Sequence, residues 1–206
     1  MTTIEKIEET KAVETESTPK KTTRTKKTTT KTISSRKTKA TINKELRMKA
    51  KDIDVEVESL AVGVVFYESK KTGEMLDLNE AGMREVVSLD LLIDMSKKSK
   101  SLLTKLVIGI VDVFSDDYTV EDVVELLGLK DCYVFDEMNI ENVDKFILDT
   151  DYTEFEKKFN AIKVEDSKYR FVERSIMLHK EGLLDSEAKK GLLERFSGNP
   201  YLYKNI

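Results

Sequence analysis

The sequence predicts an α+β protein, in which a disordered basic arm precedes a small, mostly β module and a cluster of short α-helices. Three observations predict this order. Residues 53–114 alternate between short β-type runs and turn residues. Residues 115–198 carry apolar side chains at helical spacing between capping residues. Residues 19–40 hold nine Lys or Arg, no Asp or Glu and almost no large apolar side chain, a composition that cannot bury enough surface to fold alone.

The arm, residues 1–40, divides into an acidic stretch, 1–18, and a basic stretch, 19–40. Residues 1–18 carry a net charge of −3 and residues 19–51 carry +12, so a chain of net charge −4 leaves −13 on residues 52–206. A body of that charge repels phosphates. Nucleic-acid binding would therefore depend on the arm.

We expect the basic stretch to be an electrostatic tether. It has no aromatic residue, which excludes base stacking and indicates salt-dependent binding without sequence preference. Its partner could be nucleic acid or an acidic protein surface, including that of a neighbouring subunit. A solubilising tail without a partner is the third possibility. The tether residues are Lys20, Lys21, Arg24, Lys26, Lys27, Lys31, Arg36, Lys37 and Lys39.

Residues 41–52 form a basic linker in which we expect a short helix with Ile42, Leu46 and Met48 on one side. The β-rich module, residues 53–114, starts with the alternating strand IDVEV. It contains one helix, SLDLLIDMSKK, which Ser88 caps.

The longest β-type run in this module is LAVGVVFY, residues 60–67. It is nearly continuous in apolar and β-branched types and predicts a well-buried strand, with Gly63 at a bulge. Shorter strands are expected at residues 75–78 and 83–88, after turns, and a further buried strand at residues 105–114.

The helical module, residues 115–198, contains recognisable caps. Thr119 precedes an apolar-periodic run that stops at Gly128. Thr153 and Glu156 have the spacing of a capping box. A second short helix with Val143, Phe146, Ile147 and Leu148 is expected after the link LKDCYVFDEM. Further helices are expected at 167–181 with a stop at Gly182, and after Asp185 or Ser186 with an end at Gly198.

The C-terminal tail, residues 199–206, combines aromatic and aliphatic side chains after the last helix stop. These side chains either fold back onto the core or anchor a partner, because tyrosine offers a large contact area with few rotors. The possible anchor residues are Tyr201, Leu202, Tyr203 and Ile206.

Catalytic and cofactor signatures are missing from the sequence. Cys132 and His179 are the only cysteine and histidine, so they could make one nucleophile–base pair but no zinc site. The glycines form no phosphate-binding motif. The acidic pairs Asp116–Asp117 and Asp149–Asp151 precede helices and are expected as caps, and the charged run 165–170 is expected as a solvated helix face. We therefore expect no enzyme, cofactor or metal site.

No membrane association is expected. The longest apolar stretch, Leu106–Phe114, is too short to cross a bilayer and contains Asp112. The first ten residues lack the basic and apolar regions of a secretory signal. The single cysteine fits a reducing compartment.

The order of elements resembles that of small virion-associated or assembly proteins of tailed bacteriophages. The resemblance covers about residues 57–198 and rests on VFYESKKTGEMLDLNEAGMREVVSLDLLIDM, on YTVEDVVELLGLKDCYVFDEMNIENVDKFI and on LERFSG. It implies an assembly role without catalytic residues.

The sequence thus predicts a non-enzymatic bacteriophage structural or assembly protein that docks on other virion subunits in an oligomeric context, with the arm as its tether. It would act in the virion or the host cytoplasm. The alternative is a cytoplasmic nucleic-acid-binding accessory or regulatory protein that uses the arm.

Overall fold

The structure is a computed structural model that describes residues 38–204. The α+β class is confirmed. Residues 1–37 and 205–206 lie outside the described part. The prediction of a disordered arm therefore concerns residues that the structure does not describe. The helices are α1 (Lys39–Met48), α2 (Leu89–Lys98), α3 (Lys100–Thr104), α4 (Val120–Leu127), α5 (Ile140–Leu148), α6 (Tyr152–Ala161), α7 (Glu165–Lys180) and α8 (Glu187–Ser197). The strands are β1 (Asp54–Ser59), β2 (Val65–Glu68), β3 (Met75–Leu78), β4 (Arg84–Ser88) and β5 (Ile108–Val113).

The five strands form two antiparallel sheets. One has the order β4-β1-β5, and the other is the hairpin β2-β3. In the first sheet Val57 of β1 faces Glu85 on one side and Ile110 on the other, next to a register shift between Glu56 and Val57. In the hairpin Val65 faces Leu78. The expected strands at residues 75–78 and 83–88 are confirmed.

The predicted strand over residues 60–67 is wrong. Leu60 ends the paired part of β1 by donating its N–H to the Val107 carbonyl, and the chain then turns through Gly63 at φ 115°. Only the last three residues of the run enter a strand, β2, in a different sheet. Val62 and Val64 are exposed. A continuous apolar run indicates burial only when both faces of the strand are covered, and here one face is open.

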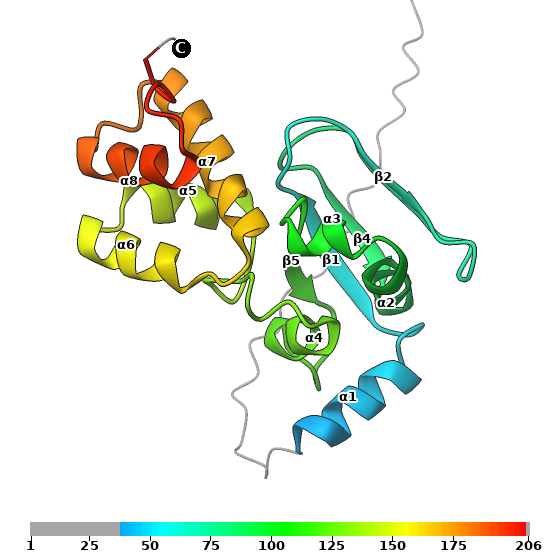
Figure 1. Ribbon diagram of the computed structural model, residues 1–206. Helices are drawn as coiled ribbons and strands as arrows, with labels where there is room; N and C mark the ends of the chain where they lie inside the picture. Colours follow the sequence, from blue (N-terminus) through cyan, green and yellow to red (C-terminus); the bar gives the residue numbers. More distant parts are fainter. Residues whose placement is uncertain (1–37, 205–206) are drawn as a thin grey trace, which may run out of the picture. The chain divides into compact units, whose positions relative to one another are not determined.

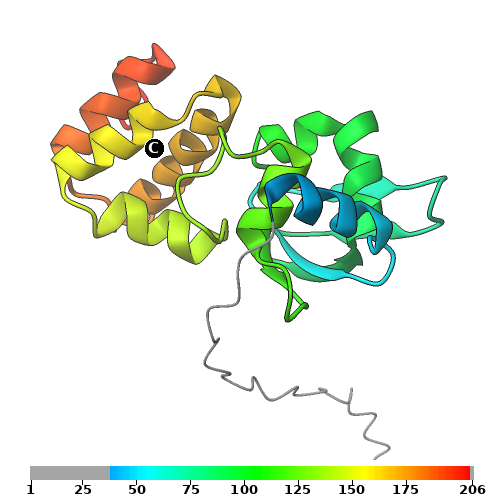
Figure 2. The same cartoon turned by 90° about the horizontal axis from the view of Figure 1, so that it is seen from below.

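An aliphatic cluster holds the strands and α1 to α4 together (Figures 1 and 2). Helix α4 packs beside α1 and against β5, while α2 packs beside β4. Ile42 and Leu46 of α1 are buried in this cluster, as predicted, but Met48 is 70 % exposed. Residues 89–104 contain two helices, α2 and α3, where the sequence predicts one.

An aromatic cluster fills the space between α5, α6, α7 and α8. Phe155, Phe159 and Phe171 are fully buried there, and the Phe159 and Phe171 rings meet edge to face at 6.4 Å. Lys189 of α8 is buried against this cluster. Its Nζ donates to the carbonyls of Ile147 and Leu148 at 2.7 and 3.1 Å, which supplies partners to the last carbonyls of α5.

Most predicted helix ends are confirmed. Ser88 caps α2 and Ser186 caps α8, each with its side chain. Thr119 opens α4 with a full capping box, and Gly128 closes it in the left-handed region. Thr153 does not cap α6, because Asp151 accepts the N–H of Glu154 and the helix begins two residues earlier. Both residues suit a cap, and the aspartate precedes the first apolar turn.

The two clusters meet along the outer edge of β5. The Met138 N–H donates to the Ile110 carbonyl at 3.1 Å. A Cβ atom on Gly109 would lie 1.9 Å from the Met138 carbonyl oxygen, so the backbones approach too closely for any other residue. Nearby, buried Glu58 accepts from Arg84 Nε at 2.6 Å and from the N–H of Ile140, at the start of α5, at 2.7 Å.

Candidate binding surfaces and polar clusters

The tether residues fall almost wholly outside the described residues. Lys20, Lys21, Arg24, Lys26, Lys27, Lys31, Arg36 and Lys37 precede Thr38, where the description begins. Lys39 is the first residue of α1 rather than part of an arm, and its Nζ lies 2.6 Å from Glu125 Oε2 on α4. Thr38 caps α1 by accepting the N–H of Thr41. The basic stretch therefore leads directly into a folded helix.

The solvent-facing side of α1 continues the positive charge of the arm. Lys44, Arg47 and Lys51 are exposed, and none of them takes part in an ion pair within residues 38–204. We call these three residues the α1 basic stripe. Lys44 and Arg47 lie three residues apart on α1, roughly 4.5 Å along the helix axis, and Lys51 lies in the turn after the end of α1. Exposed Met48 lies between them.

The C-terminal tail divides between the two outcomes that the sequence left open. Tyr203 is buried, its hydroxyl lies 2.7 Å from that of Ser175 on α7, and its ring meets His179 edge to face. Burial raises the pKa of Tyr203 to about 12. Tyr201 is exposed, Leu202 is half-buried, and Ile206 lies outside the described residues. Tyr203 thus belongs to the core. Of the possible anchor residues that the structure describes, only Tyr201 is exposed and could contact a partner.

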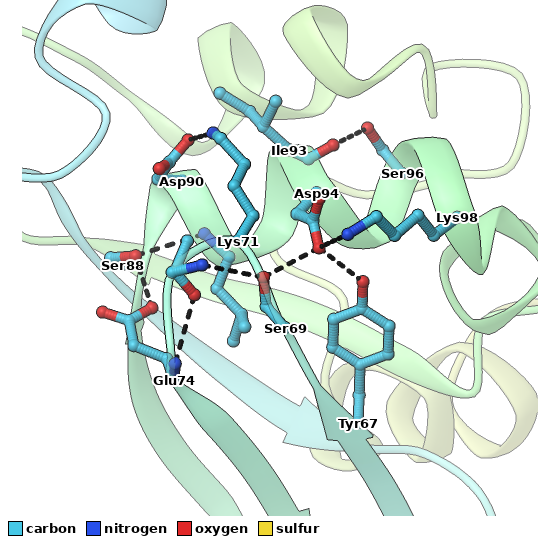
Figure 3. A network of polar contacts seen from close by, with 12 residues as sticks. Tyr67, Ser69, Lys71, Glu74, Ser88, Asp90, Ile93, Asp94, Ser96 and Lys98 are labelled. Atoms are coloured by element: carbon cyan, nitrogen blue, oxygen red, sulfur yellow. Dashed lines mark hydrogen bonds and ion pairs between the residues drawn. The ribbon is translucent and has the colours of Figure 1, made fainter.

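A network of polar contacts around Asp94 joins the β2-β3 hairpin to α2 (Figure 3). Asp94 is buried, and its Oδ2 accepts from Ser69 Oγ at 2.7 Å, Lys98 Nζ at 3.0 Å and Tyr67 Oη at 3.0 Å. The hydrogen bond from Ser69, followed by that from Lys98, lowers the pKa of Asp94 to about 2. All three partners stabilise the ionised carboxylate, so the network fixes the hairpin and leaves no group poised for proton transfer.

The same helix also holds the tip of the hairpin. Lys71 Nζ lies 2.5 Å from Asp90 Oδ1, and the Ser88 hydroxyl donates to Glu74 Oε2 at 2.6 Å (Figure 3). Together with the Asp94 network, these contacts fix the inner face of the hairpin against α2. The opposite face of the hairpin is left to solvent.

The outer hairpin face, which we define as Val64, Phe66, Glu68, Met75 and Asp77, is unusually apolar for an exposed surface. Val64 is 67 %, Phe66 56 % and Met75 60 % exposed. Val65 and Tyr67 point to the opposite, buried side, as strand alternation requires. Clustered exposed apolar side chains of this kind mark interaction surfaces. The sequence did not indicate this face, because the apolar run that contains Val64 and Phe66 predicts a well-buried strand.

The residues that could carry nucleophilic or metal chemistry are not brought together. Cys132 is buried, and burial raises the pKa of its thiol, which disfavours the nucleophilic thiolate. His179 packs on Tyr203 instead. Within residues 38–204 no group of three His, Cys, Asp or Glu side chains could hold a metal ion.

In the same part of the chain, no helix is long and apolar enough to cross a membrane.

A shallow cavity of about 520 Å³ is lined by Phe135, Phe146 and charged side chains of α5 and its flanking loops. Its lysines, Lys145 and Lys158, are paired with glutamates on their own helices.

The sequence suggested that the charged run at residues 165–170 is a solvated helix face. In the structure, part of this run is buried. The side chain of Arg170 is mostly buried, and its Nε donates to the Leu106 carbonyl at 3.1 Å. Lys168 Nζ lies over the Phe159 and Phe196 rings, 5.5 Å from each centroid. These contacts seat α7 against its neighbours.

Comparisons of the chain with protein-family models, curated proteins and solved structures find no match. The function therefore has to be argued from the surfaces themselves.

Proposed function

We propose that the protein is a non-enzymatic structural or assembly protein, whose folded part docks on protein subunits and whose arm and α1 basic stripe tether it to nucleic acid. The proposal rests chiefly on the α1 basic stripe. Lys44 and Arg47 lie on the exposed side of a helix that directly continues the basic stretch, and Lys51 lies in the turn that follows this helix. A linear array of unpaired cations fits a regularly charged polyanion such as a phosphate backbone.

The anchoring of α1 supports this role. Buried Ile42 and Leu46 hold the helix on the folded part, so the stripe is presented on a rigid support. A rigid contact adjoining the arm adds phosphate contacts without further ordering of the chain.

Two features support a role in assembly. The outer hairpin face carries three exposed apolar side chains, Val64, Phe66 and Met75, and clustered exposed apolar side chains mark interaction surfaces. The resemblance of residues 57–198 to virion-associated proteins of tailed bacteriophages supports a proposal in which this docking takes place in a phage particle.

Nucleic-acid binding can be tested by titrating the full chain with duplex DNA over a range of salt concentrations. The variant Lys44→Gln/Arg47→Gln/Lys51→Gln should bind more weakly, and the slope of log K against log salt should fall by about 2 to 3, because each lost phosphate contact removes roughly 0.9. The matched control, Lys70→Gln/Lys157→Gln/Lys180→Gln, changes the charge equally at exposed sites elsewhere. Equal slopes for the two variants would contradict a role for the stripe.

The second candidate function is a free nucleic-acid-binding accessory or regulatory protein. The α1 basic stripe favours it as much as the first. The two candidates differ in the outer hairpin face, which only a protein with docking partners needs. If Phe66→Ser leaves the co-purification of partner subunits unchanged, the accessory function is the better one.

A further inference from the structure

The hairpin has a strand edge with no partner. Within residues 38–204, β2 pairs only with β3. The N–H of Ser69 donates to the Glu74 carbonyl at 3.0 Å. Because hydrogen-bonded positions alternate along an antiparallel pair, Tyr67 and Val65 bond to β3, and the backbone groups of Phe66 and Glu68 point to the free edge.

Such an edge is a template for another extended chain. A strand added there would place alternate side chains beside Val64, Phe66 and Glu68 on the outer hairpin face. The fitting side chains are therefore a cation beside Glu68 and an apolar group beside Phe66, two positions apart. The Glu68 carboxylate has no ion-pair partner within the described residues.

We propose that residues 31–35 of a second copy of this chain add to the free edge of β2 as an antiparallel strand. In this register Ile33 lies beside Phe66 and Lys31 lies beside Glu68. Ile33 is the only large apolar side chain between residues 19 and 40, so its position fixes the register.

The opposite orientation fits less well. With Ile33 kept beside Phe66, a parallel strand would place Lys31 beside apolar Val64 and the neutral Ser35 beside Glu68. The composition of the segment also suits a strand, since residues 28–33 read TTTKTI and are rich in β-branched types.

The added strand comes from another copy, because the chain that connects residues 31–35 to α1 is too short to reach β2 of the same copy. Two residues, Arg36 and Lys37, lie between Ser35 and Thr38 at the start of α1, and the three Cα-to-Cα steps span about 11 Å at most. Figure 1 shows the first turn of α1 and β2 well separated. Mutual exchange of arms would give a closed dimer, and one-way exchange an open assembly.

The proposed strand leaves the rest of the tether free, because Lys20, Lys21, Arg24, Lys26 and Lys27 precede it. The chain could therefore exchange arms and bind nucleic acid at the same time, and an experiment can disprove either proposal without affecting the other. The tests below measure self-association without nucleic acid.

A charge exchange tests the proposed register by sedimentation of the full chain. Glu68→Lys should weaken self-association about tenfold, because it replaces an attraction by a repulsion, and Lys31→Glu should do the same. The double variant Glu68→Lys/Lys31→Glu should recover association to within about threefold of the original chain. The control Asp116→Lys changes the charge equally at an exposed loop and should have little effect. A chain that is monomeric throughout, or a double variant no better than the single ones, would overturn the proposal.

A second pair of variants tests the apolar contact. Phe66 is exposed and Ile33 precedes the described residues, so we expect Phe66→Ser and Ile33→Ser each to weaken association about tenfold while the protein stays folded. If Phe66→Ser dissociates the assembly but Ile33→Ser does not, the outer hairpin face binds another surface and the arm is not its occupant. Carbodiimide cross-linking of mixed heavy- and light-isotope copies should join Lys31 of one copy to Glu68 of another. Cross-links only within one copy would also overturn the proposal.

Discussion

The two hydrophobic clusters of this protein are filled by different side chains. The cluster around the strands and α1 to α4 is almost wholly aliphatic. The cluster between α5 and α8 is built on phenylalanine rings in mutual contact, with Phe146 close to both Phe155 and Phe171. Aliphatic side chains suit the flat, closely spaced faces of a sheet, whereas rings span the wider gaps between short helices.

The charges buried in the two clusters differ as well. Around the strands they are carboxylates, Glu58 and Asp94, which accept hydrogen bonds from hydroxyl and cationic donors. In the helical cluster the buried charge is Lys189, whose Nζ lies 5.5 Å from the centroid of the Phe155 ring. Aromatic faces attract cations and aliphatic surfaces do not. The Lys189 ammonium is thus held by two backbone carbonyls and the face of one ring, whereas the carboxylates are held by hydroxyl and cationic donors.

The largest expected effect comes from removing a ring from the aromatic cluster. Phe171 is fully buried, and Phe171→Ala should lower the free energy of unfolding by about 4 kcal/mol through lost burial and a cavity. We expect hydrogen-exchange protection to fall more in α5 to α8 than in β1 and β5, because the clusters are distinct. Leu92→Ala, in the aliphatic cluster, is the matched control and should show the reverse pattern. A uniform loss of protection in both variants would mean that the clusters unfold as one unit.

A smaller loss is expected where the clusters meet. Gly109→Ala places a methyl group against the Met138 carbonyl, and the backbone shift should cost about 2 to 3 kcal/mol. Denaturant unfolding measures this cost. Gly191→Ala is the control, because a Cβ there meets only the end of the Arg195 side chain at 3.6 Å. Equal stability of the two variants would contradict a tight contact at β5.

The response to acid should separate the two kinds of buried charge. The pKa of Asp94 is about 2 in the folded chain, against an ordinary value of 3.8. The unfolded chain therefore binds the proton first, and the stability that Asp94 contributes is full above about pH 4 and lost as the pH falls to about 2. Asp94→Asn should flatten the dependence of unfolding free energy on pH in this window.

Lys189 serves as the contrast in the same experiment. Burial lowers the pKa of its ammonium group, so this group makes the folded chain more stable as the pH rises toward the ordinary value of lysine. Lys189→Met should leave the acid window unchanged. An altered acid window in this variant would show that the two clusters titrate together.

The smallest effect is expected in the C-terminal tail. Tyr203→Phe removes the hydroxyl that meets Ser175 and should cost about 1 kcal/mol. Tyr201→Ser, at an exposed position, should change stability by less than about 0.5 kcal/mol. Thermal unfolding compares them, and a larger loss for Tyr201→Ser would place Tyr201 in the core.

Much of the fold followed from local signals. Ser88, Thr119 and Gly128 mark helix ends through their own backbone contacts, so the sequence located α2 and α4 well. The sequence pattern gave a wrong prediction where contacts with distant segments of the chain decide the structure. Gly63 and the apolar residues around it indicate a strand, but not which sheet it joins or which of its faces is covered. For the same reason Phe66 could not be recognised as part of a surface.

The sequence by itself determined the division of charge, the helix caps and the absence of catalytic signatures, because these depend on composition and on contacts a few residues apart. Only the tertiary structure decided that the first helix begins at Lys39, inside the basic stretch, and that within the described residues β2 has a free edge with an apolar outer face. It also decided that Tyr203 is core while Tyr201 is surface. These outcomes depend on which distant segments cover a residue, and burial by distant segments is not encoded in the residue's own neighbourhood.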